Sequence, residues 1–179
     1  MSCDIIIVSG LDRVGKSTVG KLLALNDTCL FECGEYIRQK IIHDEFGTAS
    51  SSKYYDTNME RFNIEIIEEM LLKMELRPEG TCLVVVGVRS SKLLESILEL
   101  PVNVYVVYVQ SEFDRRYSRH VYGNKNKFIC SKRQFEENDE LQYTWGIGEI
   151  KSMANVIISN NSSHEELLNL VKKIKASAC

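Results

Sequence analysis

The chain has 179 residues, of which 44% are hydrophobic and 26% are charged, close to the average for a globular domain. This length predicts a single domain, residues 1–179, that buries enough surface to need no disulfides or structural metal. Lys and Arg number 22 and Asp and Glu number 25, which gives a net charge of −3. The composition excludes a disordered chain, a collagen and a coiled-coil rod, and without overall basicity nucleic acid is not an expected partner.

Targeting signals and metal motifs are missing from the sequence. No apolar run approaches the roughly 20 residues of a membrane span, and Asp4 with the short run Ile5–Val8 does not make a signal peptide. We therefore expect a cytoplasmic protein, with the nucleus as the alternative, and no membrane partner. The 6 cysteines contain no C-x-x-C pair and the 3 histidines are scattered, which predicts reduced thiols and no zinc site.

Short apolar runs alternate with amphipathic segments along the chain. In chain order we expect a strand at 4–9, a helix at 16–25, a strand at 28–33, a helix at 35–46, a loop at 47–52, a helix at 58–76, a strand at 83–86, a helix at 91–98, a strand at 102–109, a helix at 112–119, a loop at 121–131, a helix at 132–141, a strand at 156–158 and a helix at 163–175. In the longest helix Phe62, Ile66, Met70 and Met74 recur every four residues, which predicts a core-facing stripe. Continuous apolar strands separated by helices predict a parallel sheet with helices on both faces.

The first predicted strand leads directly into a phosphate-binding motif. Residues 10–17 read Gly-Leu-Asp-Arg-Val-Gly-Lys-Ser and match the pattern GxxxxGK[ST] between a strand and a helix. Glycines let backbone N–H groups approach phosphates, and the helix N-terminus adds positive potential. Lys16 is expected to reach the β- and γ-phosphates, and Ser17 to offer a hydroxyl to Mg²⁺.

The sequence therefore predicts ATP and Mg²⁺ as cofactors. The alternative is a glycine-rich turn with a helix-capping serine. The residues expected to contact the nucleotide are Gly10, Asp12, Arg13, Val14, Gly15, Lys16, Ser17 and Thr18.

Together with three further segments, this loop resembles the P-loop nucleotide-kinase group, which includes adenylate kinase, thymidylate kinase, dephospho-coenzyme A kinase and deoxynucleoside monophosphate kinases. The resemblance extends over nearly the whole chain. It implies a three-layer α/β P-loop NTPase fold with five parallel strands in the order 2-3-1-4-5. It also implies an acceptor-binding insert at residues 35–76 and a short lid at residues 120–132.

Two of the segments imply an acceptor site. Residues 33–38, Cys-Gly-Glu-Tyr-Ile-Arg, are similar to the TGDxLR stretch of adenylate kinases, so Arg38 would hold the acceptor phosphate and Glu35 would lie near the acceptor. Residues 85–90, Val-Val-Gly-Val-Arg-Ser, are similar to a DGxRS stretch, so Arg89 would also contact the acceptor. The alternatives are an ordinary helix start with an acidic first turn for the former, and a surface helix cap for Arg89.

Val86 departs from the pattern of this group. The aspartate that helps to organise Mg²⁺ in these kinases falls on Val86, which can neither coordinate a metal nor accept a proton. Asp12 could take over, the metal could be held by Ser17 and water alone, or catalysis could be weak. Residues 10–18 also match GLDRxGKST, the form of the phosphate-binding loop in thymidylate kinases, where the Asp-Arg pair lies beside both phosphate chains.

The third segment implies a lid. Arg115 and Arg119 have the R-x-x-x-R spacing of the helix that leads into the kinase lid, and this spacing puts them on one helix face. Further basic residues follow at Lys125, Lys127, Lys132 and Arg133. The alternatives are a solvated basic helix paired with acidic neighbours, or polynucleotide binding, which the absence of interleaved aromatics disfavours.

The C-terminal part resembles a small kinase-like family related to dephospho-coenzyme A kinase. Residues 135–147 read FEENDELQYTWGI, and residues 154–159 are followed by Asn160, near which the adenine would lie. Asn155 replaces an aspartate of that family, and Trp145, the single tryptophan, is expected to pack at a helix corner.

We therefore expect an ATP-dependent phosphotransferase whose acceptor is a (deoxy)nucleoside monophosphate, with small-molecule nucleotides as its partners. The expected catalytic residues are Lys16, Arg89, Arg115 and Arg119, and the expected acceptor-binding residues are Asp12, Glu35, Arg38 and Arg89. One alternative is a dephospho-coenzyme A kinase-like enzyme with Glu35 as base. The other is a nucleotide-binding regulatory protein with weak or no transfer activity. Monomer and homodimer are both open.

Overall fold

The computed structural model describes residues 3–26, 29–43, 51–123 and 130–178. Its strands are β1 (Ile5–Ser9), β2 (Leu30–Glu32), β3 (Leu83–Val86), β4 (Val104–Gln110) and β5 (Val156–Ser159). Its helices are α1 (Lys16–Leu23), α2 (Cys33–His43), α3 (Ser51–Thr57), α4 (Met59–Leu76), α5 (Ser91–Leu98), α6 (Phe113–Tyr122), α7 (Lys132–Thr144), α8 (Ile147–Ser152) and α9 (His164–Ala178).

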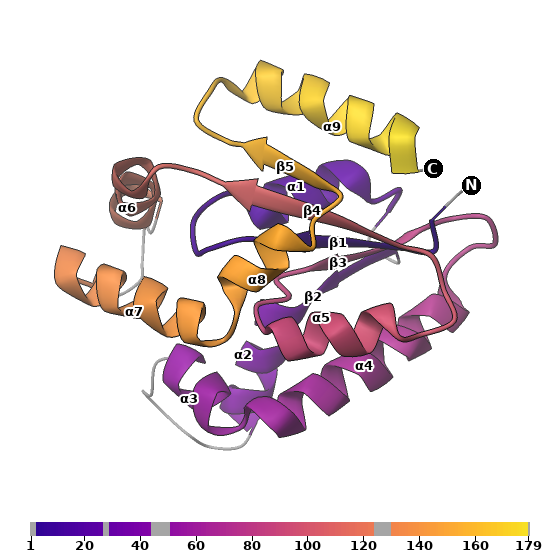
Figure 1. Cartoon of the computed structure of the whole chain (residues 1–179), viewed down its shortest axis with the longest axis horizontal. Coiled ribbons are helices and arrows are strands. Elements are labelled where there is room, and N and C mark those ends of the chain that lie inside the picture. Colours follow the sequence, from indigo (N-terminus) through magenta and orange to yellow (C-terminus); the bar gives the residue numbers. More distant parts are fainter. Residues whose placement is uncertain (1–2, 27–28, 44–50, 124–129, 179) are drawn as a thin grey trace.

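The strands form one parallel sheet in the order β2-β3-β1-β4-β5, as predicted (Figure 1). Because all strands run in the same direction, the loops that follow them meet at one edge of the sheet. The glycine-rich loop after β1, the start of α2 after β2 and the Gly87–Arg89 segment after β3 therefore become neighbours. Their proximity builds the site described below.

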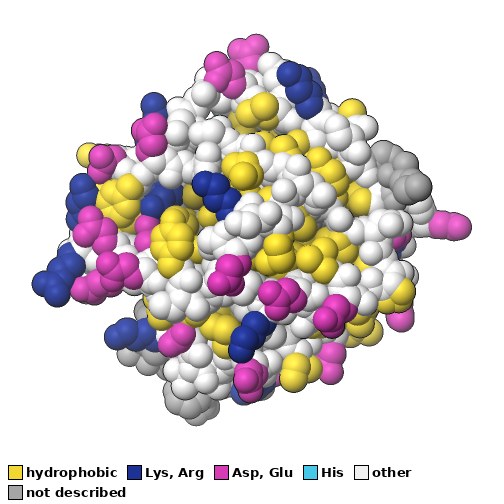
Figure 2. Space-filling view, viewed as in Figure 1, with side chains coloured by type: hydrophobic (Ala, Val, Ile, Leu, Met, Phe, Trp, Pro, Cys, Tyr) yellow, Lys and Arg dark blue, Asp and Glu magenta, His cyan; other side chains and the backbone are white. Residues whose placement is uncertain are grey.

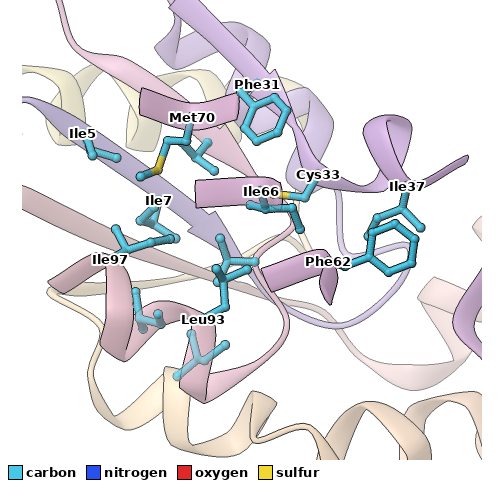
Figure 3. Close-up of a cluster of buried hydrophobic side chains, with 14 of the residues drawn as sticks. Ile5, Ile7, Phe31, Cys33, Ile37, Phe62, Ile66, Met70, Leu93 and Ile97 are labelled. Atoms are coloured by element: carbon cyan, nitrogen blue, oxygen red, sulfur yellow. The ribbon is translucent and has the colours of Figure 1, made fainter. Parts of the chain in front are cut away.

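Helices cover both faces of the sheet, which explains the continuous apolar strands. On one face, Ile6 and Val8 of β1 belong to a core with Val19 of α1 and Val171 of α9. On the other face, Ile5 and Ile7 belong to a larger core with residues of α4, α5 and α8. Figure 3 shows Ile7 among Ile66, Met70 and Ile97 in this second cluster.

The predicted stripe on α4 is present. Phe62, Ile66 and Met70 are fully buried, while Met74 is partly buried at the edge of the same core. Leu71, which lies beside the stripe, is 38% exposed.

Two helices were not predicted. Helix α3 was partly predicted as loop because its sequence, SSKYYDT, lacks an apolar period; it is held by Tyr55, which is buried against Phe62 and Trp145. Helix α8 follows α7 with only a sharp corner between them, formed by Trp145 and by Gly146 at φ 91°. Residues 124–129 of the predicted lid at 120–132 lie outside the described residues, and the lid's first three residues belong to α6 instead.

No helix in the described ranges is both long and apolar enough to cross a bilayer. No disulfide joins the 5 cysteines in the described part of the chain. On the face shown in Figure 2, Lys and Arg side chains are interspersed with Asp and Glu rather than gathered in one basic patch.

Candidate functional site: a phosphate-binding loop beside an arginine-lined pocket

The glycine-rich loop between β1 and α1 packs closely against Val109 of β4 and against Asn160, which follows β5. Gly10 has φ 139° and Gly15 has φ 102°, in the region that favours glycine. A Cβ atom at Gly10 would lie 2.1 Å from the carbonyl oxygen of Val109, and one at Gly15 would lie 2.4 Å from Nδ2 of Asn160. Another residue at Gly10 would displace the backbone of β4, and one at Gly15 would displace the Asn160 side chain and adopt a strained φ, so the loop conformation depends on both glycines.

Lys16 lies folded back over this loop. Its Nζ donates to the carbonyl oxygens of Gly10 at 2.7 Å and Leu11 at 2.6 Å. Burial lowers the pKa of Lys16 to about 7, against the opposing influence of Asp12, and the nearby cation Arg89 adds to the lowering. The carboxylate of Asp12, whose Oδ1 lies 4.0 Å from Nζ, therefore offsets only part of the cost of burying this ammonium group.

Asp12 connects the loop with two other elements. Its Oδ1 accepts a hydrogen bond from Arg89 at 2.7 Å, and its Oδ2 accepts one from Asn138 of α7 at 3.0 Å. Burial would raise the pKa of Asp12, but Arg89 and Lys16 outweigh it and lower the pKa to about 2. Asp12 is therefore a fixed anion that orients Arg89.

A pocket opens beside the loop, between α2, α3, α4 and the segment after β3. Its lining residues are Gly34, Ile37, Arg38, Tyr55, Ile66, Gly87, Arg89 and Leu93. The structure thus brings Arg38 and Arg89 to one pocket, and Arg38 forms an ion pair with Glu35 at 2.6 Å. Tyr55, which sequence reasoning missed, donates to Oδ1 of Asn63 at 2.8 Å, and burial raises the pKa of its hydroxyl.

The arginines of α6 differ from the expectation that Arg115 and Arg119 face one cleft. Arg119 donates to the carbonyl oxygens of Arg13 at 3.1 Å and Asn160 at 2.7 Å. These bonds link α6 to the loop and to the segment that follows β5. Arg115 instead lies near Glu112 at 3.7 Å, with 54% of its side chain exposed. The arginine that shares the loop-facing side is Arg116, because a spacing of three residues also puts two side chains on one face.

Arg116 is almost fully buried beside the loop. Its guanidinium donates two hydrogen bonds to the Asp139 carboxylate, at 2.9 and 2.5 Å, and one to the carbonyl oxygen of Asp12 at 3.3 Å. It also lies 5.4 Å from the ring centroids of both Phe113 and Phe135. The buried Nε of Arg116 has no hydrogen-bond partner among the described residues.

The remaining predicted residues lie around this centre. Asn160 donates from Nδ2 to the carbonyl oxygen of Val14 at 2.7 Å, so it supports the loop directly. Thr18 is exposed in the first turn of α1. Lys132 and Arg133 form exposed ion pairs with Asp114 and Glu137, whereas Lys125 and Lys127 lie outside the described residues.

Trp145 packs at the α7–α8 corner, as expected, and also contacts α3, whose Tyr55 lines the pocket. Its Nε1 donates to Asp56 of α3 at 2.7 Å, and its ring meets that of Tyr55 edge-on at 5.0 Å. The single tryptophan therefore ties α3 to α7.

Sequence reasoning also missed Glu32, the last residue of β2. The hydroxyl of Ser17 donates to Oε2 of Glu32 at 2.9 Å. A glutamate at the carboxyl end of a predicted strand was the available signal, since that edge of the sheet carries the phosphate loop. Val86, the neighbour of Glu32 on β3, is 3% exposed.

No protein-family model matches the chain. Among curated proteins, the chain is 25% identical over 172 residues to a UPF0200 protein of Pyrobaculum aerophilum, a match that covers 96% of both chains. It is 26% identical over 164 residues to a UPF0200 protein of Saccharolobus islandicus, covering 90% of this chain and 87% of that protein. Both matches cover at least 90% of this chain, and the name of these relatives states no activity.

Solved structures match at lower identity. The sugar kinase from Janibacter has a TM-score of 0.66 at 12% identity, covering 96% of this chain and 93% of its own. Shikimate kinase from Acinetobacter baumannii has a TM-score of 0.62 at 14% identity, covering 96% and 90%. TT1252 from Thermus thermophilus has a TM-score of 0.62 at 18% identity and covers both chains fully. The chain therefore has the α/β fold of P-loop kinases.

Proposed function

We propose that the protein is an ATP-dependent phosphotransferase that moves the γ-phosphoryl group to a small phosphorylated acceptor, a (deoxy)nucleoside monophosphate. The observation that carries this proposal is the juxtaposition of two anion sites at one edge of the sheet. The phosphate-binding loop holds Lys16, and the neighbouring pocket holds Arg38 and Arg89. Asp12 lies between the two sites and contacts Arg89 directly.

On the donor side, the triphosphate adds negative charge beside Lys16 to that of Asp12, which lies 4.0 Å away and offsets only part of the burial. The ammonium group leaves the carbonyl oxygens of Gly10 and Leu11 for the β- and γ-phosphate oxygens, where it neutralises the charge that shifts during transfer. Backbone N–H groups of the loop and the N-terminus of α1 complete the cradle. Arg119 and Asn160 hold the back of the loop in place.

On the acceptor side, the pocket favours a phosphate over a hydroxyl as nucleophile. A hydroxyl needs a base to accept its proton, whereas a phosphate oxygen is already nucleophilic. Asp12 is tied to Arg89 and Asn138 with a pKa of about 2, and Glu35 is paired with Arg38. Arg38 and Arg89 are the natural ligands of an acceptor phosphate, because one guanidinium group can donate two parallel hydrogen bonds to two phosphate oxygens. This arrangement favours the nucleotide over dephospho-coenzyme A.

Mg²⁺ accompanies the nucleotide in this proposal. The exposed Ser17 hydroxyl at the start of α1 fits such an ion, since Mg²⁺ prefers oxygen ligands and commonly takes phosphate oxygens and waters as the others. When bound, the ion supplies charge neutralisation on the β- and γ-oxygens. Positioning and charge neutralisation are the main demands of phosphoryl transfer, and Lys16, Arg38 and Arg89 meet them.

The test is ADP release from Mg-ATP by purified protein against a panel of all ribo- and deoxynucleoside monophosphates and dephospho-coenzyme A. We expect strong stimulation by one or two monophosphates. Lys16→Ala should lower turnover by about 100-fold or more, because a charge aimed at the transferring group is lost. Lys172→Ala, at an exposed position of α9, is the matched control and should turn over normally.

Three outcomes would contradict the proposal. Unchanged activity in a folded Lys16→Ala protein would exclude the loop as the catalytic centre. Stimulation by dephospho-coenzyme A alone would assign a hydroxyl acceptor and make Glu35 the base. ATP binding without stimulation by any acceptor would leave a nucleotide-dependent regulatory protein.

A further inference from the structure

We propose that Glu32 is the carboxylate that holds Mg²⁺ together with Ser17, in the role that the resemblance to nucleotide kinases assigns to the position of Val86. This inference rests on the proposed function, because the ion would arrive with ATP. It replaces the possibilities that Asp12 holds the ion or that no carboxylate does.

The strand register puts Glu32 where the missing aspartate would act. Glu32 of β2 and Val86 of β3 are direct partners in the parallel sheet, and partnered residues project toward the same face. Val86 faces α1, since a Cβ atom at Gly20 would lie 2.3 Å from its Cγ2. Glu32 therefore projects toward α1 as well, one strand further out.

The side chain of Glu32 is long enough to reach the phosphate-binding loop from there. Its Oε2 accepts the hydrogen bond from the Ser17 hydroxyl at 2.9 Å. The two oxygens of this contact are a carboxylate and a hydroxyl, the ligand types that suit Mg²⁺. Glu32 also lines an open groove with Lys21 and Tyr36, so an ion and its waters have access.

Asp12 is a poor substitute because its oxygens are occupied. One bonds to Arg89 and the other to Asn138, and Lys16 lies 4.0 Å away. The described residues contain no group of three or more His, Cys, Asp or Glu side chains that could hold a metal ion by themselves. One carboxylate, one hydroxyl and the phosphate oxygens of ATP are a sufficient set for a nucleotide-bound Mg²⁺.

The experiment measures the Kd of ATP by calorimetry in excess Mg²⁺ and in EDTA, for the wild-type chain, Glu32→Gln and Glu69→Gln. The Glu32→Gln substitution keeps the size of the side chain and its contact with Ser17 but removes the charge. Glu69 lines the same groove from α4 and is the matched control. Binding of Mn²⁺ in the presence of ATP, followed by electron paramagnetic resonance, gives a second readout that does not depend on turnover.

We expect Mg²⁺ to tighten ATP binding in the wild-type chain and in Glu69→Gln. In Glu32→Gln this enhancement should fall by about 10-fold or more, as loss of a group that supports a metal does elsewhere. Metal-free ATP should bind Glu32→Gln equally well or more tightly, because a negative charge facing the polyphosphate has gone. Adding Val86→Asp to Glu32→Gln should restore part of the Mg²⁺ enhancement.

Wild-type Mg²⁺ enhancement and Mn²⁺ affinity in Glu32→Gln would overturn the inference while leaving the proposed function intact. Weaker ATP binding by Glu32→Gln in EDTA would also overturn it, since that result would indicate a structural role. A wild-type chain that binds no ATP with or without Mg²⁺ would instead overturn the proposed function, and this inference with it.

Discussion

At the scale of single residues, Lys16 is a group whose protonation state changes near neutral pH. Its ammonium contacts two neutral carbonyl oxygens, and burial lowers its pKa from 10.5 to about 7. Between these two values an unfolded chain holds a proton that the folded chain has lost, so the Lys16 contribution to stability increases as pH rises across this window. Nucleotide binding has the opposite dependence, because the triphosphate attracts the protonated form.

ATP affinity should therefore fall as pH rises above about 7.5, by up to about tenfold per pH unit for one coupled proton. Phosphate groups titrate near pH 6 and contribute little above this range. Calorimetry at pH 7.5, 8.5 and 9.5 in buffers of different ionisation enthalpy would show the proton uptake directly. Lys16→Arg keeps its charge at all these values and should give a flat profile. A flat profile in the wild-type chain would show that Lys16 is already protonated.

At the scale of elements, α7 joins parts of the site that are far apart in sequence. Asn138 bonds to Asp12 of the phosphate-binding loop, and Asp139 pairs with Arg116 of α6. At the C-terminal end of α7, Trp145 bonds to Asp56 of α3. The helix that follows the predicted lid therefore contacts the phosphate-binding loop and, through Trp145, the helix α3 beside the arginine-lined pocket.

The buried pair of Arg116 and Asp139 makes this junction sensitive to substitution. Asp139→Ala would leave the Arg116 charge buried between Phe113 and Phe135, and should lower the free energy of unfolding by about 3–5 kcal/mol. The double variant Arg116→Met, Asp139→Leu should recover most of that loss, because it removes both charges. Urea unfolding followed by far-UV circular dichroism measures the differences. An Asp139→Ala chain within about 1 kcal/mol of the wild type, on the order of an ordinary surface substitution, would contradict a buried ion pair here.

At the scale of the whole molecule, the apolar runs of the sequence were sufficient for the parallel sheet, whereas the strand order followed from the resemblance to P-loop nucleotide kinases. Apolar runs such as Leu83–Val86 and the motif at residues 10–17 each lie within a few consecutive residues, so a single sequence is enough to recognise them. Helix α3 was not recognised because it is held by tertiary contacts of Tyr55 with Phe62 and Trp145. Propensity alone could not indicate it.

For the site as well, residues marked by a short motif were predicted, and residues that depend on contacts distant in sequence were not. Lys16 was predicted from the motif at residues 10–17, and Arg38 and Arg89 from the resemblance of residues 33–38 and 85–90 to short stretches of nucleotide kinases. Arg116 was missed because its importance depends on Asp139, 23 residues further along the chain. Glu32 was missed because the role that we propose for it depends on its strand register with Val86, which a single sequence does not reveal.

Trp145 gives the molecule an optical reporter that needs no labelling. It is the single tryptophan of the chain, and its indole N–H is bonded to Asp56 and its ring lies against Tyr55, which lines the pocket. All tryptophan emission therefore originates from one place, the joint between α3 and α7. A ligand that moves α3 away from that joint exposes the indole to water and shifts its emission to longer wavelength. Binding in the pocket can therefore be followed by the emission wavelength of Trp145 as well as by turnover.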